Sequence, residues 1–206
     1  MVEKILIIGK KSQVAQSFYN CDLYKNLYSI DIRNNKSFEA DLYKAIYKYK
    51  IRYIVNCVGY TDVINSEKNY KEALMLNEYL PNQLSKICLK TNVKLIHFST
   101  DYVFDGKKNE GYYNYDNCNP KTHYGKSKYK GELKIKESGC EYLIIRLCGV
   151  YSTFRKNFVK TILYKLANHK IIKLPKNIIC NPLYASDIPN FISFVLRSNY
   201  KKRKII

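Results

Sequence analysis

Residues 4–9 read KILIIG, a continuous apolar run that closes on a glycine, and this pattern decides the fold. A short, unbroken run of this kind is typical of a strand buried on both faces of a parallel sheet. A stretch with helical spacing, 13–19, follows at once. Similar strand-like runs recur at 26–32, 51–59, 93–100 and 141–151, and helical stretches at 38–50, 71–91 and 127–138 separate them. This strict alternation predicts an α/β fold built on a doubly wound parallel sheet.

The composition suits a folded domain with a strong positive charge. Hydrophobic residues make up 46% of the 206 residues, and 36 Lys and Arg face 17 Asp and Glu, for a formal net charge of +19. Clustered cations bind nucleic acids by displacing counterions from phosphates, with an affinity that falls steeply with salt. The lysines are scattered, however, and Lys, Ile, Tyr and Asn are all abundant, as AT-rich codons would make them. We therefore favour an anionic, nucleotide-bearing substrate over a nucleic-acid partner.

The cysteines and histidines give no sign of a disulfide scaffold or a metal site. Cysteines occur at 21, 57, 88, 118, 140, 148 and 180, an odd number without any C-x-x-C spacing, and the three histidines are dispersed. This usage predicts reduced, buried thiols and no bound metal. The apolar run at 5–8 is too short for a signal peptide or a membrane span, so we expect a cytoplasmic location and no membrane partner.

Ligands of doubly wound sheets bind at the carboxyl ends of the strands, so the residues that follow each strand are the candidates for a site. Gly9, Ser12 and Ala15 follow the first strand at the spacing of a dinucleotide-binding turn in which only the first glycine remains. Asp31 lies 22 residues beyond Gly9, where a carboxylate accepts hydrogen bonds from a ribose. Arg33, two residues later, could meet a 2′-phosphate, so the choice between NAD and NADP stays open.

The stretch YGKSK, 124–128, places a phenol and an ammonium four residues apart in a predicted helix. Four residues are one helical turn, so Tyr124 and Lys128 share a face. A nearby cation stabilises a phenolate, so we expect the pKa of Tyr124 to lie below its usual value of about 10. Thr100, at the end of the fourth predicted strand, could bind the same carbonyl oxygen. The set predicts a proton donor to a carbonyl group under reduction.

These residues resemble a known family. A hydroxyl at the end of the fourth strand followed by Tyr-x-x-x-Lys is similar to the extended short-chain dehydrogenase/reductase superfamily, which has a Rossmann-type fold. Within it, the sequence resembles the dTDP-4-dehydrorhamnose reductase family. The likeness rests on NCVGYT (56–61), FSTDYVFDG (98–106), NP (119–120), YGKSKYKGE (124–132) and NPLYASDIPNFI (181–192).

The resemblance implies an activity and a set of site residues. It implies that NADPH or NADH reduces the 4-keto group of a nucleotide-linked 6-deoxy sugar, with Thr100, Tyr124 and Lys128 as the catalytic set and Tyr124 as the proton donor. It implies cofactor contacts at Gly9, Ser12, Gln13, Val14, Asp31, Ile32, Asp41, Leu42, Cys57, Val58, Gly59, Tyr60, Asn77, Ser99 and Lys128. It implies substrate contacts at Thr61, Tyr102, Phe104, Tyr124 and Asn181. Asn77 would also bridge a strand to the proton relay.

Some positions depart from the family pattern and keep alternatives open. Ser12 replaces a glycine, Ile64 replaces an acid, and Gly149 stands where the family has an aromatic substrate contact. The chain forms one domain, 1–206, in which 150–206 supplies a reduced substrate lobe packed on the dinucleotide fold, and KKRKII (201–206) is similar to the approach to a strand that does not follow. A non-catalytic NAD(P)-binding regulatory subunit, or a sugar-nucleotide epimerase or dehydratase, remains an alternative, and so does a homodimer.

Overall fold

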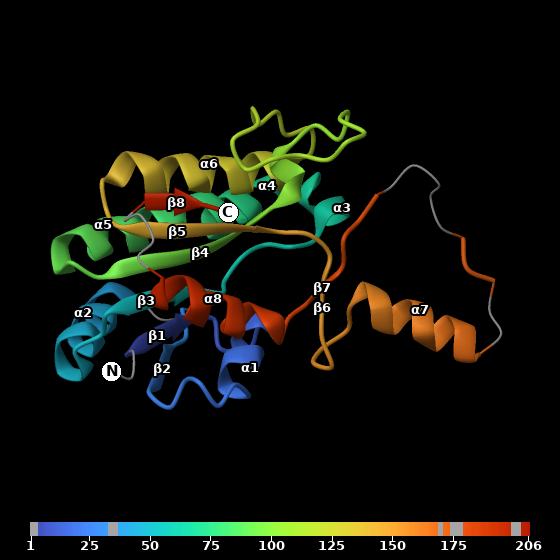
Figure 1. Ribbon diagram of the computed structural model, residues 1–206. Coiled ribbons are helices and arrows are strands. Elements are labelled where there is room, and N and C mark those ends of the chain that lie inside the picture. Colours follow the sequence, from blue (N-terminus) through green and yellow to red (C-terminus); the bar gives the residue numbers. More distant parts are fainter. Residues whose placement is uncertain (1–3, 33–36, 169–170, 174–178, 199–202) are drawn as a thin grey trace.

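The computed structural model describes residues 4–32, 37–168, 171–173, 179–198 and 203–206, and its centre is a six-stranded parallel sheet (Figure 1). The strands are β1 (Ile5–Ile8), β2 (Leu27–Ile30), β3 (Tyr53–Asn56), β4 (Lys94–Thr100), β5 (Tyr142–Leu147) and β8 (Arg203–Ile205). Their order is β2-β1-β3-β4-β5-β8. Because the chain leaves β1 in one direction and returns to β3 on the other side, the order reverses between these two strands. Doubly wound sheets open a ligand crevice at this point.

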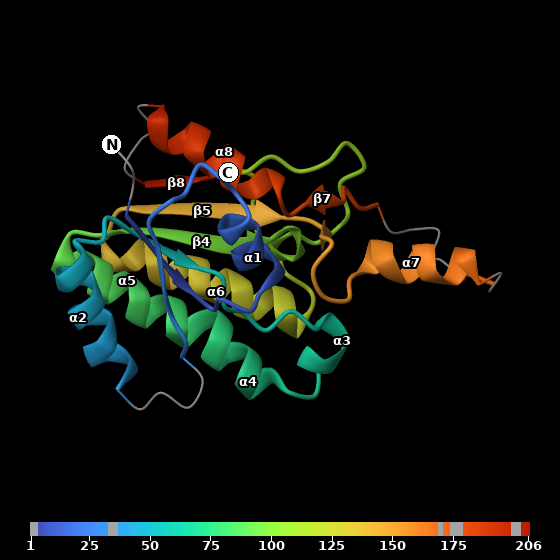
Figure 2. The same ribbon diagram turned by 90° about the horizontal axis from the view of Figure 1, so that it is seen from below.

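Helices cover both faces of the sheet (Figure 2). On one face lie α2 (Phe38–Tyr49), α5 (Leu80–Thr91) and α6 (His123–Ser138), and on the other lie α1 (Gln13–Tyr19) and α8 (Asp187–Arg197). The shorter elements are α3 (Val63–Ser66), α4 (Tyr70–Leu74), the π-helical turn η1 (Met75–Tyr79) and the 3₁₀ turn η2 (Asp101–Val103). The doubly wound fold predicted from the alternating runs is confirmed.

The core consists of the apolar strand runs and the helix faces that cover them. All four residues of β1 are fully buried, as its unbroken apolar sequence predicts. Leu42, Leu84 and Ile135 cover one face, and Phe18, Ile188 and Ile192 cover the other. Alternate side chains of a strand point to opposite faces, so a strand buried on both sides is mostly apolar. The polar exceptions lie toward the carboxyl ends of β3 and β4: Asn56, His97, Ser99 and Thr100.

The C-terminal region differs from the prediction. KKRKII leads into a strand after all, because Arg203–Ile205 pairs in parallel with Tyr142–Ile144 and forms β8 at the sheet edge. The predicted strand 141–151 is two strands, β5 and the short β6 (Val150–Tyr151), which pairs with β7 (Leu183–Tyr184) in a separate sheet. The elements α8 and β8 therefore belong to the main layers of the fold, and the substrate-side role of 150–206 stays a prediction.

One helix lies outside these layers. The helix α7 (Phe158–Ala167) has no buried residue and projects from the sheet in both views (Figures 1 and 2). Phe158, Leu163, Tyr164 and Leu166 on it are all more than half exposed. Among the described residues no helix is both long and apolar enough to span a membrane.

Candidate active site

The helix α6 brings the predicted phenol and ammonium to the carboxyl edge of the sheet. The Thr122 hydroxyl accepts a hydrogen bond from the Gly125 N–H over 3.0 Å and so starts the helix at His123. Tyr124 therefore stands in the first turn, with Lys128 one turn later. Both side chains are buried, so the pair faces the sheet rather than solvent.

Thr100 joins the Tyr124 phenol to a carboxylate. Its hydroxyl donates to Asp101 Oδ1 over 3.0 Å, and it is also hydrogen-bonded to Tyr124. A hydroxyl carries one proton, so Thr100 accepts the hydrogen bond from Tyr124. The Tyr102 ring meets the Tyr124 ring edge-on, with centroids 5.6 Å apart. Tyr124, Thr100 and Asp101 thus form one hydrogen-bonded chain at the end of β4.

Lys128 is held below the phenol by the sheet. Its Nζ donates to the Phe98 carbonyl over 2.5 Å. A Cβ placed on Gly59 would lie 3.7 Å from this Nζ and 3.1 Å from Asn77 Oδ1. Glycine at position 59 therefore lets the end of β3 pack closely against Asn77 and Lys128.

Asn77 locks α6 to the loop after β3, and it does so from the π-helical turn. Its side-chain amide donates to Ser127 Oγ over 2.9 Å and to the Tyr60 carbonyl over 3.0 Å, and its Oδ1 accepts from the Tyr60 N–H over 2.9 Å. The side chain is fully buried. A Cβ on Gly131 would lie 2.0 Å from the Asn77 carbonyl, so only glycine allows this close helix contact. The predicted bridging role of Asn77 agrees with these bonds.

The predicted direction of the Tyr124 pKa is wrong. Burial raises the pKa of Tyr124 to about 12, helped by the nearby Asp101 and opposed by the hydrogen bond to Thr100. The same burial lowers the pKa of Lys128 to about 8, because the ammonium loses its hydration, and Glu132 offsets part of that loss. At neutral pH the phenol is therefore protonated rather than a phenolate.

The lowered pKa of Lys128 predicts a pH-dependent stability. Below about pH 8 both folded and unfolded chains hold this proton, and the buried ammonium destabilises the fold by its full desolvation. From about pH 8 to 10.5 only the unfolded chain holds it, so this group adds stability as pH rises. We expect Lys128→Met to be more stable than wild type at neutral pH by about 3 kcal/mol, an order-of-magnitude figure.

The pH trend is the discriminating observation. Urea denaturation should show the advantage of Lys128→Met shrinking by about 1 kcal/mol between pH 7 and pH 9. Lys126→Met is the matched control, since Lys126 is exposed on the same helix and its loss should change stability by less than about 0.5 kcal/mol. An advantage that stays constant or grows with pH would contradict the assignment.

The turn after β1 has the shape that a dinucleotide turn needs. Gly9 has φ +88°, and a Cβ on it would lie 2.5 Å from a Val58 methyl group, so the ends of β1 and β3 touch. Ser12 caps α1 by accepting from the Ala15 N–H over 3.0 Å. Gln13 donates to the Val150 carbonyl over 3.0 Å and so ties α1 to β6. Val14 is buried against the sheet.

The candidates near β2 fall into two groups. Asp31 and Asp41 line a cavity of about 440 Å³ between β2 and α2, and Ile32 follows directly after Asp31. Leu42 is fully buried in the core, and its contact with the cofactor stays a prediction. Arg33, proposed to meet a 2′-phosphate, lies outside the described residues.

The remaining candidates lie in the loop after β3, near Lys128, or stand further out. Cys57, Val58 and Tyr60 are half-buried in the loop after β3, and Thr61 beyond them is exposed. The Ser99 Oγ is buried with no hydrogen-bond partner, beside the Thr100 position.

Three predicted substrate contacts lie at the outer side of the site. Tyr102 is 40% exposed, and Asn181 is exposed. Phe104 stacks on Tyr112 at 4.4 Å and lies under the Arg146 guanidinium at 5.0 Å, which makes it part of the scaffold.

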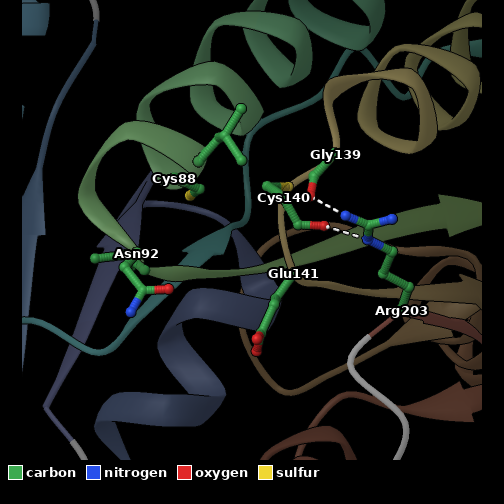
Figure 3. A pocket seen from close by; sticks show the side chains of 8 residues that line it. Cys88, Asn92, Gly139, Cys140, Glu141 and Arg203 are labelled. Atoms are coloured by element: carbon green, nitrogen blue, oxygen red, sulfur yellow. Dashed lines mark hydrogen bonds between the residues drawn. The ribbon is translucent and has the colours of Figure 1, made fainter.

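A second cavity, of about 560 Å³, lies at the other edge of the sheet (Figure 3). Cys88, Asn92, Gly139, Cys140, Glu141 and Arg203 line it together with Leu89 and Val93. These residues stand at the amino ends of β4 and β5, about 20 Å along β4 from Thr100. It is therefore separate from the Tyr124 site. In the described part of the chain, no three His, Cys, Asp or Glu side chains are placed to hold a metal ion.

Two residues of the site were missed from the sequence. Asp101 ends the hydrogen-bonded chain from Tyr124, and Ser127 receives Asn77. Asp101 follows Thr100 directly, so the end-of-strand rule could have found it. Ser127 faces Asn77 only because two distant helices pack closely, which no local pattern reveals.

Comparisons with known proteins agree with this geometry. The family model described as RmlD substrate binding domain matches residues 3–205. A dTDP-4-dehydrorhamnose reductase of Aggregatibacter actinomycetemcomitans is 28% identical over 197 residues, which cover 92% of this chain and 66% of that protein. A spore coat polysaccharide biosynthesis protein of Bacillus subtilis is 32% identical over 140 residues, covering 68% of this chain and 50% of that protein. The chain thus spans between half and two thirds of the length of these relatives.

A solved structure shows the same architecture. The dTDP-4-dehydrorhamnose reductase of Bacillus anthracis, in complex with NADP, superposes with a TM-score of 0.89 at 26% identity, covering 100% of this chain and 74% of that one. A doubly wound sheet with a Tyr-x-x-x-Lys pair at its carboxyl edge defines the extended short-chain dehydrogenase/reductase class. Within that class, the chain belongs to the RmlD substrate binding domain family.

Proposed function

We propose that this chain binds NADPH or NADH and reduces the 4-keto group of a nucleotide-linked 6-deoxy sugar, the activity of the dTDP-4-dehydrorhamnose reductases that it resembles. The observation that carries the proposal is the assembly of Tyr124, Thr100 and Lys128 at the carboxyl edge of the sheet, with Asn77 fixing the helix that bears two of them. A structural role alone does not require a buried phenol hydrogen-bonded to a strand-end hydroxyl.

The residues present fit a nicotinamide cofactor. Gly59 places no side chain beside Lys128, and the buried Ser99 Oγ lacks a partner. Unpaired buried polar groups are rare and call for a ligand or a water. Together with the Gly9 turn, these residues would hold the cofactor, which supplies a hydride to the substrate carbonyl when bound. Asp31 would take a ribose hydroxyl.

Each catalytic residue has a separate task. Tyr124 Oη is protonated at neutral pH and gives its proton to the oxygen that becomes the product hydroxyl. Thr100 Oγ1 orients the phenol by accepting its hydrogen bond. Lys128 places a positive charge one turn below, and Asn77 with Ser127 holds that turn in register with the loop after β3.

The test is oxidation of reduced nicotinamide by the full chain. The substrate is a dTDP-4-keto-6-deoxy sugar, supplied together with its 3,5-epimerised form, and NADH and NADPH are compared in parallel. We expect substrate-dependent loss of the reduced-nicotinamide absorbance with one of the two cofactors. If calorimetry shows that the cofactor binds but no turnover is seen, the proposed reductase activity is contradicted. That result would favour a non-catalytic NAD(P)-binding subunit. The homodimer, the cytoplasmic location and a role in polysaccharide biosynthesis remain predictions.

A further inference from the structure

Two cysteines meet at the outer side of the Tyr124 site. Cys148 Sγ and Cys180 Sγ are 3.5 Å apart, although 32 positions separate them in the chain. Cys148 stands between β5 and β6 and is half-buried, whereas Cys180 precedes β7 and is exposed. The sequence predicts buried thiols at these positions, which is wrong for Cys180. Among the described cysteines this pair combines a close contact with a route to solvent.

The backbone conformation around Cys148 and Cys180 allows the two thiols to lie in contact. Gly149 has φ +50°, and a Cβ on it would lie 2.6 Å from Cys180 Sγ, so a larger residue would push the two thiols apart. The parallel pairing of β6 with β7 then fixes the two segments, with the Ala185 N–H donating to the Tyr151 carbonyl over 2.8 Å. A disulfide needs a sulfur separation of about 2.05 Å, so the thiols must approach by roughly 1.5 Å.

The pair lies close to the Tyr124 site. Burial, together with the nearby Asp101, raises the pKa of Cys148 to about 12. Both thiols also act on the pKa of Tyr102, whose ring meets the Tyr124 ring edge-on. A change at the thiol pair therefore takes place beside the Tyr124 site.

We propose that Cys148 and Cys180 form a two-thiol modification site for low-molecular-weight disulfides, which the protein reduces as it closes its own disulfide. The Cys180 thiolate attacks one sulfur of the small disulfide, forms a mixed disulfide and releases one small thiolate. Cys148 then gives its proton to the small thiolate released in the first step and attacks the Cys180 sulfur. The second small thiolate leaves, so two protein thiols are oxidised and one small disulfide is reduced to two thiols.

The order of attack follows from exposure. Thiolates, not thiols, are the nucleophiles in this exchange. Cys180 is open to solvent, whereas Cys148 is half-buried and holds its proton because partial burial and the nearby Asp101 raise its pKa. Cys148 thus resolves the mixed disulfide instead of starting it.

The disulfide would act on the site through the segment before β7, and this consequence rests on the proposed function. Closing the bond fixes Cys180 and the adjoining Asn181, a predicted substrate contact. Loss of one hydrogen bond to a charged group costs roughly tenfold in an equilibrium or a rate. We expect oxidation of the pair to reduce turnover by about that factor.

Peptide mass mapping tests the site without any reference to activity. The full chain is incubated with oxidised glutathione, alkylated and cleaved with trypsin, which releases Cys148 in peptide 147–155 and Cys180 in peptide 177–197. We expect these two peptides to be joined, with a mass lower by two hydrogens than their sum. In Cys148→Ser, Cys180 should instead retain one glutathione.

The controls separate the pair from the other cysteines. Cys118→Ser should form the same link as wild type, because Cys118 bonds to Arg146 at a different place. Glutathione retained on wild-type Cys180, or Cys180 linked equally to several other cysteines, would overturn the proposal.

The second test measures how oxidation of the thiol pair changes turnover. If the reductase activity is present, Cys180→Ser should resist oxidised glutathione while wild type loses activity reversibly. If the activity is absent, the mass result still decides the modification site alone.

Discussion

Replacement of Tyr124 with Phe is expected to lower turnover by about 10²–10⁴-fold and to leave cofactor binding close to normal. The substitution removes only the hydroxyl, and the ring keeps its edge contact with Tyr102 at the same place in α6. The Thr100 oxygen still accepts from the Tyr102 N–H over 3.2 Å, so the fold should lose no more than about 1 kcal/mol. What disappears is the proton that the product hydroxyl requires.

Tyr129→Phe is the matched control for this prediction. Tyr129 is a half-buried phenol on the same helix, but it stands outside the hydrogen-bonded chain through Thr100. Its variant should turn over at nearly the wild-type rate. Steady-state rates and calorimetric cofactor binding are measured for both variants. Wild-type-like turnover by Tyr124→Phe would remove Tyr124 from the mechanism, and an equal loss in both variants would point to a damaged helix.

The central strands can be predicted from the sequence because a strand that is buried on both faces consists mainly of apolar residues. β1 is apolar throughout, β3 is apolar up to Asn56, and β4 has an apolar centre, and their order along the chain limits the topology to few arrangements. The strand β8 has a weaker hydrophobic pattern, since Arg203 and Lys204 are exposed and charged. Such charges are typical of edge strands, which are exposed to solvent and to unwanted pairing. Its position follows from pairing with β5, which the local sequence does not encode.

The candidate site is predictable where it depends on strand ends and helical spacing, and less so where it depends on burial. The positions of Thr100, Tyr124 and Lys128 follow from those two rules. The direction of the Tyr124 pKa does not, because the packing around the phenol outweighs the lysine one turn away. The contact between Cys148 and Cys180 depends on a pairing across 32 positions and is invisible to any local pattern.

A second large effect is expected at the buried ion pair that joins α6 to β5. We expect Arg146→Met to lower the free energy of unfolding by about 3–5 kcal/mol, which is a third or more of the stability of many domains. Glu132 is fully buried, and Arg146 binds it with two hydrogen bonds, from Nε over 2.9 Å and from Nη2 over 2.7 Å. The substitution leaves the Glu132 charge buried without its partner.

The pair also holds the segment that carries Phe104 and Cys118. Arg146 Nη1 donates to the Asn114 carbonyl over 3.0 Å, Nη2 reaches Cys118 Sγ at 3.1 Å, and the guanidinium lies over the Phe104 ring. Loss of Arg146 should therefore loosen this segment as well as α6, one turn beyond Lys128. Limited proteolysis around 104–118 should be faster in Arg146→Met than in wild type.

A double variant separates the cost of the unpaired charge from the loss of packing. Glu132→Leu with Arg146→Met removes both charges and fills the space with apolar atoms, a replacement that is often neutral or stabilising for buried pairs. Urea denaturation should show the double variant recovering most of the stability that Arg146→Met loses, while cleavage around 104–118 stays fast because the Asn114 and Cys118 contacts are still missing. If the double variant is as unstable as the single one, the ion pair acts through packing, and the buried Glu132 charge is not what destabilises the fold. Exposed Lys134, paired with Glu137 at 2.9 Å on the same helix, is the contrasting case, and Lys134→Met should change stability by less than about 1 kcal/mol.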